Sequence, residues 1–226
     1  MNRAACVVGA SGGIGKAIVA RLERDGWSPV LCMSLGDGID IDVRDQGSVR
    51  TAFAAGRNRS PELGLLVIAT GIVDQTSTDR LSLERWNEVL AINLTGPFLC
   101  CREGVDWLAD GARIVLLGSL SAKTGGGLTG AAYAVSKGGV ATLSKALARE
   151  LAPRRITVNC VEPGGVETPM LATNDPAALR AMVDATPLRR SAMPEEIAGA
   201  VAFLASRDAA FITGTSVAVN GGLRMD

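Results

Sequence analysis

Tyr133 and Lys137, two residues suited to proton transfer, stand four positions apart in the sequence. In a helix this spacing places both side chains on one face. A phenol ordinarily loses its proton near about pH 10, and an adjacent ammonium group favours the phenolate and lowers that pKa. Tyr133 is the only tyrosine of the chain, and the sequence contains no histidine. The pair is therefore a natural acid/base unit, although a half-buried tyrosine beside a surface lysine explains the same spacing.

Two serines precede this pair in the segment Gly-Ser-Leu-Ser at 118–121, directly after an apolar run. A serine hydroxyl at the carboxyl end of a strand can hydrogen-bond a reacting oxygen. Ser119 is the first candidate for that contact, and Ser121 is its competitor. The serine that makes no such contact is interpreted as an ordinary loop residue.

Asn93 stands four positions before Pro97. Proline has no N–H, so Pro97 cannot bond the carbonyl of residue 93. We expect the helix to kink there and leave that carbonyl free. Such a carbonyl could hold a water that relays protons to Lys137 and Tyr133, whereas the plainer interpretation is an asparagine that marks a helix break.

A glycine-rich segment, Gly-Ala-Ser-Gly-Gly-Ile-Gly at 9–15, lies between an apolar run and an amphipathic segment of helical length. Glycines allow a tight turn and a close approach to a pyrophosphate, whose charge the helix N-terminus stabilises. The segment predicts a nucleotide-binding loop, with a simple strand-to-helix turn as the alternative.

Short apolar runs alternate with helix-length segments along the whole chain. Near-continuous apolar strands are typical of parallel strands that are covered on both faces. Their alternation with helices predicts one α/β domain over 1–226, with a doubly wound, mostly parallel sheet of about seven strands and helices on both faces. Strands are expected at 4–8, 29–33, 39–42, 65–69, 113–117, 157–161 and 216–219, and helices at 13–25, 46–55, 83–108, 131–151, 177–185 and 194–205.

Only residues 34–38 separate the second expected strand from the third. A parallel crossover normally needs about a dozen residues or more. The helix between these strands must therefore be missing, and we expect a bare loop in its place.

The balance of positive and negative residues bears on which partners the protein can bind. Lys plus Arg and Asp plus Glu number 23 each, and the charges form no block, which disfavours nucleic acid or an anionic membrane as the main partner. The most apolar run, 63–73, is too short to span a bilayer. Five cysteines without a Cys-x-x-Cys pair fit a reducing cytoplasm, and without histidine we expect no metal site.

Together, and in their order along residues 7–222, these motifs resemble the short-chain dehydrogenase/reductase family, whose glycine loop reads Gly-x-x-x-Gly-x-Gly. The members most similar in pattern are the 3-oxoacyl-[acyl-carrier-protein] reductases. The resemblance implies a single-domain Rossmann fold and an NAD(P)-dependent oxidoreductase. Its reaction would be reversible hydride transfer between a nicotinamide and a ketone or secondary alcohol. A 3-oxoacyl thioester, a sugar or polyol, a steroid-like alcohol and a cyclic diol all stay open as substrates.

The resemblance also implies catalytic roles. Tyr133 is the acid/base, Lys137 lowers its pKa and binds the ribose, Ser119 polarises the carbonyl, and Asn93 holds the relay water. The loop from Ser119 to Tyr133 is one residue longer than the family's usual spacing, which keeps Ser121 in competition.

Cofactor contacts follow by the same resemblance: Asp42 meets the adenine, and Val166 and Thr168 hold the nicotinamide carboxamide. An acidic residue after the second strand would select NAD and an arginine NADP, but Ser34 stands there. With no cation in view the sequence favours NAD, and Asp37 could supply the carboxylate. The expected contacts are Gly9, Ser11, Gly12, Gly13, Ile14, Gly15, Ser34, Asp42, Val43, Ala69, Thr70, Gly71, Tyr133, Lys137, Pro163, Gly164, Val166 and Thr168.

The sequence departs from the family's pattern after the fourth expected strand. Where the family usually has Asn-Asn-Ala-Gly, residues 68–71 read Ile-Ala-Thr-Gly. Residues 170–190 should form a substrate flap, and the helices bearing Asn93 and Tyr133 should pair subunits into a homodimer or homotetramer. The alternative function is a non-catalytic NAD(P)-binding regulator. An epimerase or dehydratase on this fold would carry a longer substrate domain.

Overall fold

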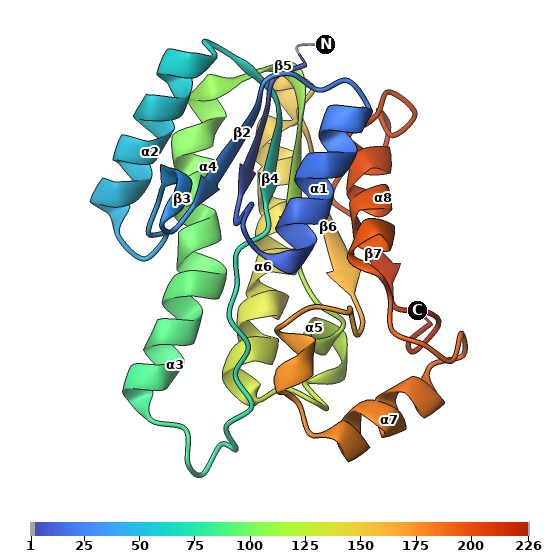
Figure 1. Cartoon of the computed structure of the whole chain (residues 1–226). Coiled ribbons are helices and arrows are strands. Elements are labelled where there is room, and N and C mark those ends of the chain that lie inside the picture. Colours follow the sequence, from blue (N-terminus) through green and yellow to red (C-terminus); the bar gives the residue numbers. More distant parts are fainter. Residues whose placement is uncertain (1–2, 226) are drawn as a thin grey trace.

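The computed structural model describes residues 3–225. Within that range seven parallel strands form one sheet in the order β3-β2-β1-β4-β5-β6-β7 (Figure 1). The strand order reverses at β1, and sheets of this kind bind ligands outside the carboxyl ends of the strands near such a reversal. The strands are β1 (Ala5–Val8), β2 (Val30–Ser34), β3 (Asp37–Asp40), β4 (Leu63–Ile68), β5 (Leu108–Leu117), β6 (Thr157–Pro163) and β7 (Ser216–Val219).

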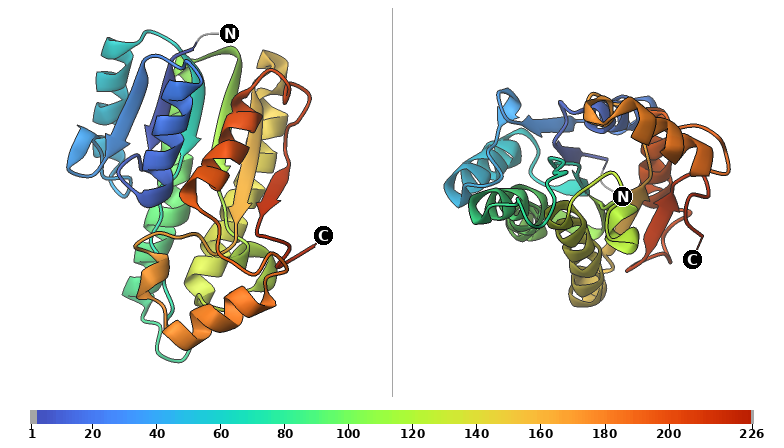
Figure 2. Two further views of the ribbon diagram at one scale, coloured as in Figure 1. Left: turned by 45° about the vertical axis from the view of Figure 1, so that its right-hand side comes forward. Right: turned by 90° about the horizontal axis from the view of Figure 1, so that it is seen from below.

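Helices cover both faces of the sheet, as the two views of Figure 2 also show. On one face lie α2 (Gln46–Arg59), α4 (Gly96–Gly104) and α6 (Ala131–Leu151), and on the other α1 (Gly13–Arg24) and α8 (Pro194–Ala205). The remaining α-helices in the described part are α3 (Leu83–Leu90), α5 (Ser121–Thr124) and α7 (Pro176–Ala185). The expected single-domain α/β fold with a doubly wound sheet is confirmed.

Two apolar cores explain why the strands are apolar at almost every position. Along β1, Cys6 and Val8 face the core under α2, α4 and α6, whereas Ala5 and Val7 face the core under α1 and α8. Successive side chains of a strand point to opposite faces. A strand that is covered on both faces therefore needs apolar residues throughout.

The connection from β2 to β3 is a bare loop, as its length predicted. β3 pairs with β2 in parallel, with Met33 opposite Ile39. The loop contains Gly36 at φ +71°, and Gly38, in the first half of β3, has φ +66°. A Cβ on Gly38 would lie 2.5 Å from the carbonyl oxygen of Cys32, so the tight return requires glycine there.

The expected single helix over 83–108 is wrong. The structure divides it into α3, a π-helical turn at Ala91–Thr95, α4 and a 3₁₀ turn at Val105–Trp107. Strand β5 then begins at Leu108, five residues earlier than expected, because Leu108 pairs with Leu63 of β4. The sequence Ala-Asp-Gly at 109–111 lacks the apolar pattern of a strand and concealed this part of β5.

Smaller differences concern the ends of elements. β3 ends at Asp40 and not at 42, so Asp42 lies beyond the strand, where its N–H bonds the hydroxyl of Ser48 at 2.9 Å. The short helix α5 was not expected from the sequence. Elsewhere the expected bounds agree within a few residues, and they agree fully for α6, α8 and β7. Among the described residues, no helix has both the length and the apolar character needed to cross a membrane.

Candidate active site

A cavity of about 570 Å³ opens at the carboxyl ends of the central strands. This volume lies in the roughly 300–1,000 Å³ range of small-molecule sites. Its walls come from the glycine loop, from the ends of β4, β5 and β6, from α6, and from the flap at 170–190, of which α7 lies across this end of the sheet (Figure 1). Ser119, Tyr133 and Lys137 all line it. Asn93 does not, since it is fully buried beside it.

Helix α6 brings the expected acid/base pair to the cavity. Tyr133 and Lys137 share one face, with Lys137 Nζ 5.9 Å from the centre of the Tyr133 ring. The Lys137 ammonium donates a hydrogen bond of 2.9 Å to the carbonyl of Leu117, at the end of β5. Burial disfavours the charged amine and lowers the pKa of Lys137 to about 8.

The pKa of Tyr133 departs from expectation. Burial raises it above the ordinary value of a phenol, and a hydrogen bond with Ser119 lowers it by less than burial raises it. The expected net lowering of the Tyr133 pKa is therefore not found in this structure, because burial outweighs the groups that favour the phenolate. The physical reason is that a phenolate loses its hydration in the cavity, while the lysine is itself held by a carbonyl and has a depressed pKa.

The two candidate serines differ in their partners. Ser119 makes the hydrogen bond with the Tyr133 phenol, and its hydroxyl accepts the N–H of Ser121 at 3.1 Å. The hydroxyl of Ser121 accepts a hydrogen bond of 3.0 Å from Thr129, in the loop before α6. Ser119, and not Ser121, is thus the serine whose interaction lowers the pKa of Tyr133.

Asn93 lies in the π-helical turn, where the N–H of Gly96 bonds the carbonyl of Ala91, five residues back. The structure has a π-helical turn where a kink was expected; that the Asn93 carbonyl is free and holds a relay water stays a prediction. The Asn93 side chain accepts the N–H of Ile72 and donates to its carbonyl, both at 2.9 Å. It also donates to Ser136 at 3.2 Å, and Ser136 donates to the carbonyl of Tyr133. Asn93 therefore ties the loop after β4 to the helix of the acid/base pair.

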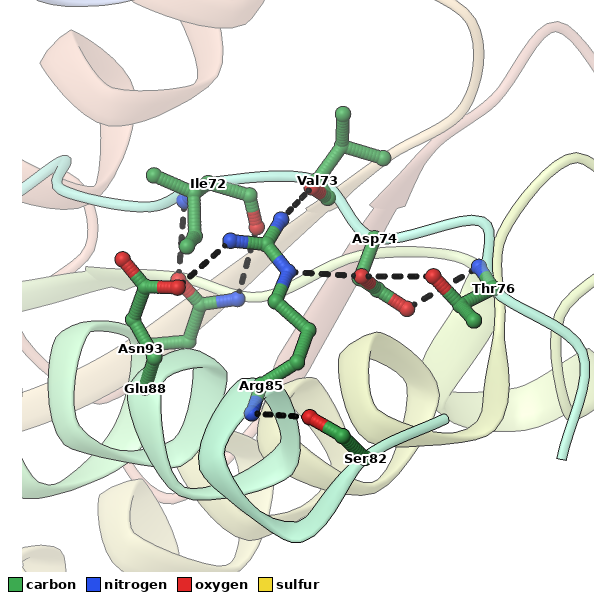
Figure 3. A network of polar contacts seen from close by, with 8 residues as sticks. All are labelled: Ile72, Val73, Asp74, Thr76, Ser82, Arg85, Glu88 and Asn93. Atoms are coloured by element: carbon green, nitrogen blue, oxygen red, sulfur yellow. Dashed lines mark hydrogen bonds and ion pairs between the residues drawn. The ribbon is translucent and has the colours of Figure 1, made fainter. Parts of the chain in front are cut away.

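An ion-pair network beside Asn93 holds the same loop (Figure 3). Arg85 of α3 donates to the carboxylate of Asp74 at 2.8 Å and to the carbonyl of Val73 at 3.1 Å, and pairs with Glu88 at 2.8 Å. Asp74 is buried, and its backbone carbonyl accepts a hydrogen bond of 2.7 Å from the N–H of Gly130. Gly130 is the N-cap of α6, so the network reaches the start of the catalytic helix. Sequence reasoning missed it, because an acid and a base eleven residues apart form no local pattern.

The glycine loop has the geometry of a phosphate cradle. Gly9 has φ +84°, and a Cβ on Gly15 would lie 2.0 Å from the carbonyl oxygen of Gly9. A Cβ on Gly13 would lie 2.8 Å from the methyl group of Thr168. These close approaches exclude side chains and leave backbone N–H groups at the start of α1, which suits a pyrophosphate.

Other expected cofactor residues are distributed around the same edge. The hydroxyl of Ser34 accepts the N–H of Ser11 at 2.9 Å and so supports the glycine loop. The Thr70 hydroxyl is buried at the cavity without a protein partner in the described part of the chain, as a ligand contact would require. Thr168 donates to the carbonyl of Val166 at 3.2 Å.

Asp42 has a partner that the sequence did not reveal. Arg44 pairs with its carboxylate at 2.7 Å, and hydrogen bonding by Arg44 lowers the pKa of Asp42. The neighbouring Val43 is buried. A Cβ added to Gly96 would lie 2.8 Å from the Cβ of Val43. All five cysteines are free thiols, and the described residues form no group of three or more metal-ligating side chains.

Known proteins resemble this chain in sequence and in fold. Residues 9–224 match the family model described as enoyl-(acyl carrier protein) reductase. The chain is 33% identical to the 3-oxoacyl-[acyl-carrier-protein] reductase MabA of Mycobacterium tuberculosis, with 100% of this chain and 94% of that protein covered. It is 35% identical to the 3-oxoacyl-[acyl-carrier-protein] reductase FabG of Escherichia coli, with 99% and 98% covered. A crystal structure of a short-chain dehydrogenase/reductase from Brucella melitensis superposes with a TM-score of 0.93 at 32% identity, covering 100% of this chain and 98% of that one.

The fold and the relatives thus define an α/β oxidoreductase. The chain belongs to the short-chain dehydrogenase/reductase family, close to its 3-oxoacyl-[acyl-carrier-protein] reductases.

Proposed function

We propose that this protein catalyses NAD(P)-dependent, reversible hydride transfer between a nicotinamide and a ketone or secondary alcohol. The observation that carries the proposal is the convergence of Ser119, Tyr133 and Lys137 on one cavity, which the ends of β4 and β6 also line. The bound nicotinamide supplies or accepts the hydride. This chain's residues orient the reacting carbon and move the proton.

In the direction of reduction, the Tyr133 hydroxyl donates its proton to the carbonyl oxygen of the substrate. Ser119 hydrogen-bonds the same oxygen and stabilises the charge that develops there. The Lys137 ammonium stabilises the phenolate that remains. Asn93 fixes the loop and α6 relative to each other through Ile72 and Ser136, and its carbonyl holds the water that returns a proton.

The cofactor is proposed to bind along the carboxyl edge of the sheet. Its pyrophosphate would contact the backbone at Gly9, Ser11, Gly12, Gly13, Ile14 and Gly15, its adenosine Ser34, Asp42 and Val43, and its nicotinamide end Ala69, Thr70, Gly71, Tyr133, Lys137, Pro163, Gly164, Val166 and Thr168. The Cβ-free cradle and the buried Thr70 hydroxyl support this assignment. We propose NAD as the preferred form, with Asp37 on the short β2–β3 loop as the carboxylate near the ribose.

We also propose that the protein works in the cytoplasm as a homodimer or homotetramer assembled through α4 and α6. Phe98 of α4 and Val135 of α6 are 43% and 50% exposed, and such apolar side chains suit a subunit contact. Light scattering measures the mass directly, and a monomer at micromolar concentration would contradict this part of the proposal.

The test of the function is a panel of ketones and secondary alcohols, 3-oxoacyl thioesters first because of the relatives' names, with NAD(H) and NADP(H). Turnover is followed at the absorbance of the reduced nicotinamide. We expect turnover with at least one pair, and the better cofactor tests the preference for NAD. Tight cofactor binding without turnover of any substrate would favour the non-catalytic regulator.

A further inference from the structure

The part of the cavity beyond Tyr133 has apolar walls. Val73 comes from the loop after β4 and Leu128 from the loop before α6, while the flap and the C-terminal segment contribute the rest. Met170 of the flap is 40% exposed. Apolar surface that faces an open cavity is favourable only when an apolar ligand covers it.

Polar side chains on this side are already engaged within the protein. The Thr124 hydroxyl bonds the carbonyl of Gly126 at 3.1 Å, and that of Thr129 donates to Ser121 at 3.0 Å. Asn174 donates to the carbonyl of Leu171 at 2.8 Å and accepts from the amide of Gln75 at 2.9 Å. The hydroxyl groups left to a substrate lie at the reacting end, around Ser119 and Tyr133.

Charge is almost absent from the cavity. Of the described residues that line it, Lys137 is the only one with a charged side chain. That lysine is buried, and it donates to the Leu117 carbonyl next to the tyrosine. A carboxylate or phosphate farther along the substrate would lose its water without gaining a counter-ion, and extra hydroxyl groups would lose hydrogen bonds to water without replacement.

We propose that the cavity selects an uncharged substrate whose reacting carbonyl or hydroxyl is the only polar group recognised, on an otherwise apolar body. The inference rests on the proposed function and narrows it. Esters and thioesters of apolar 3-oxo acids and alicyclic or aryl ketones fit this class. Polyols, sugars and keto acids with a free carboxylate do not.

The experiment compares three substrates of similar size with the preferred cofactor: an uncharged 3-oxo ester, the same chain ending in a carboxylate, and a polyhydroxy ketone. We expect kcat/KM for the ester to exceed both others by roughly a hundredfold or more, the range set by unpaired polar groups in an apolar site. Equal or better turnover of the charged or polyhydroxy substrate would overturn the inference alone. Failure of all three, and of the wider panel, would overturn the proposed function and this inference with it.

A matched pair of variants tests the wall itself. Leu128→Arg places a guanidinium where a carboxylate could pair with it, whereas Leu128→Gln changes size and polarity without charge. We expect the arginine variant, and not the glutamine variant, to shrink the preference for the ester over the carboxylate by about tenfold. Retained cofactor affinity shows that each variant is folded. An unchanged preference in a folded arginine variant would overturn the assignment of this wall to the substrate.

Discussion

Lys137 is the residue whose ionisation has the clearest consequence for activity. Its pKa is lowered to about 8, so the ammonium that we propose to stabilise the Tyr133 phenolate is lost as pH rises through that value. We expect kcat/KM for carbonyl reduction to be level below pH 8 and to fall above it. A pH–rate profile measures this directly. Lys137→Met should lower the rate by about 10²–10⁴-fold and remove that limb of the profile.

The same shift affects stability, with a defined sign. The folded protein disfavours the charged lysine, so between about pH 8 and the ordinary lysine pKa the unfolded chain binds more protons than the folded one. Stability should therefore rise with pH across this window through Lys137. In Lys137→Met the rise of stability with pH should be smaller. An equal rise in both proteins would contradict a buried Lys137 with a lowered pKa.

Because Tyr133 is the only tyrosine of the chain, the ultraviolet absorbance of phenolate reports on it alone. We expect its titration midpoint above the ordinary phenol pKa, since burial raises it. Ser119→Ala removes a hydrogen bond that lowers the pKa, so the midpoint should rise further. Ser121→Ala is the matched control and should leave it in place. The reverse pattern, recorded while circular dichroism shows a folded chain, would assign the contact to Ser121.

At the scale of elements, the loop at 72–76 positions both α3 and the start of α6. Asp74→Asn weakens the pairing with Arg85, which is partly exposed to solvent, and we expect a loss of about 1–2 kcal/mol in unfolding free energy. The rate constant kcat should fall more than KM rises, because Gly130 and Tyr133 shift relative to Ser119. Asp25→Asn, which breaks the exposed pair with Arg21, is the control and should change stability by no more than about 0.5 kcal/mol.

The Asp74 carboxyl also makes the stability that its ion pair with Arg85 provides sensitive to acid. Burial raises its pKa, but hydrogen bonds from Arg85 and Thr76 lower it by more, for a net depression. A depressed carboxyl stabilises the fold above its unfolded pKa of about 4, and this stability is lost as pH falls through the folded value. Denaturation of the wild type below pH 4 should therefore be steeper than that of Asp74→Asn.

Local patterns predicted the central elements well, and three of the four catalytic candidates line one cavity. Apolar runs mark strands that two layers of helices cover, and Tyr133, Lys137 and Ser119 lie in short segments whose spacing is itself informative. Three features depended on the assembled molecule. Strand β5 begins at Leu108 because Leu108 pairs with Leu63 of the neighbouring strand. Asp74 meets Arg85 only after the loop folds back, and the raised pKa of Tyr133 follows from burial in the finished cavity.

At the scale of the whole molecule, packing between the layers leaves little space at particular glycines. A Cβ on Gly56 of α2 would lie 2.4 Å from the ring of Trp107 and 2.9 Å from Met33. Gly56→Ala should therefore destabilise the protein by about 1–3 kcal/mol, despite the better helix propensity of alanine. At Gly199 of α8 the nearest atom is the flexible end of Arg21, at 3.6 Å. Gly199→Ala should stabilise by about 0.5–1 kcal/mol, as chemical denaturation can measure. Equal effects of the two changes would contradict this packing.

The proposed reaction depends most on one phenol, that of Tyr133, which transfers a proton as the hydride moves. Its most direct test is the turnover of Tyr133→Phe with the best substrate and cofactor of the panel, alongside cofactor affinity from fluorescence quenching. We predict a fall in kcat of about 10²–10⁴-fold with cofactor affinity changed no more than a few-fold. A variant that binds cofactor normally and turns over at the wild-type rate would contradict the assignment of Tyr133 as the acid/base.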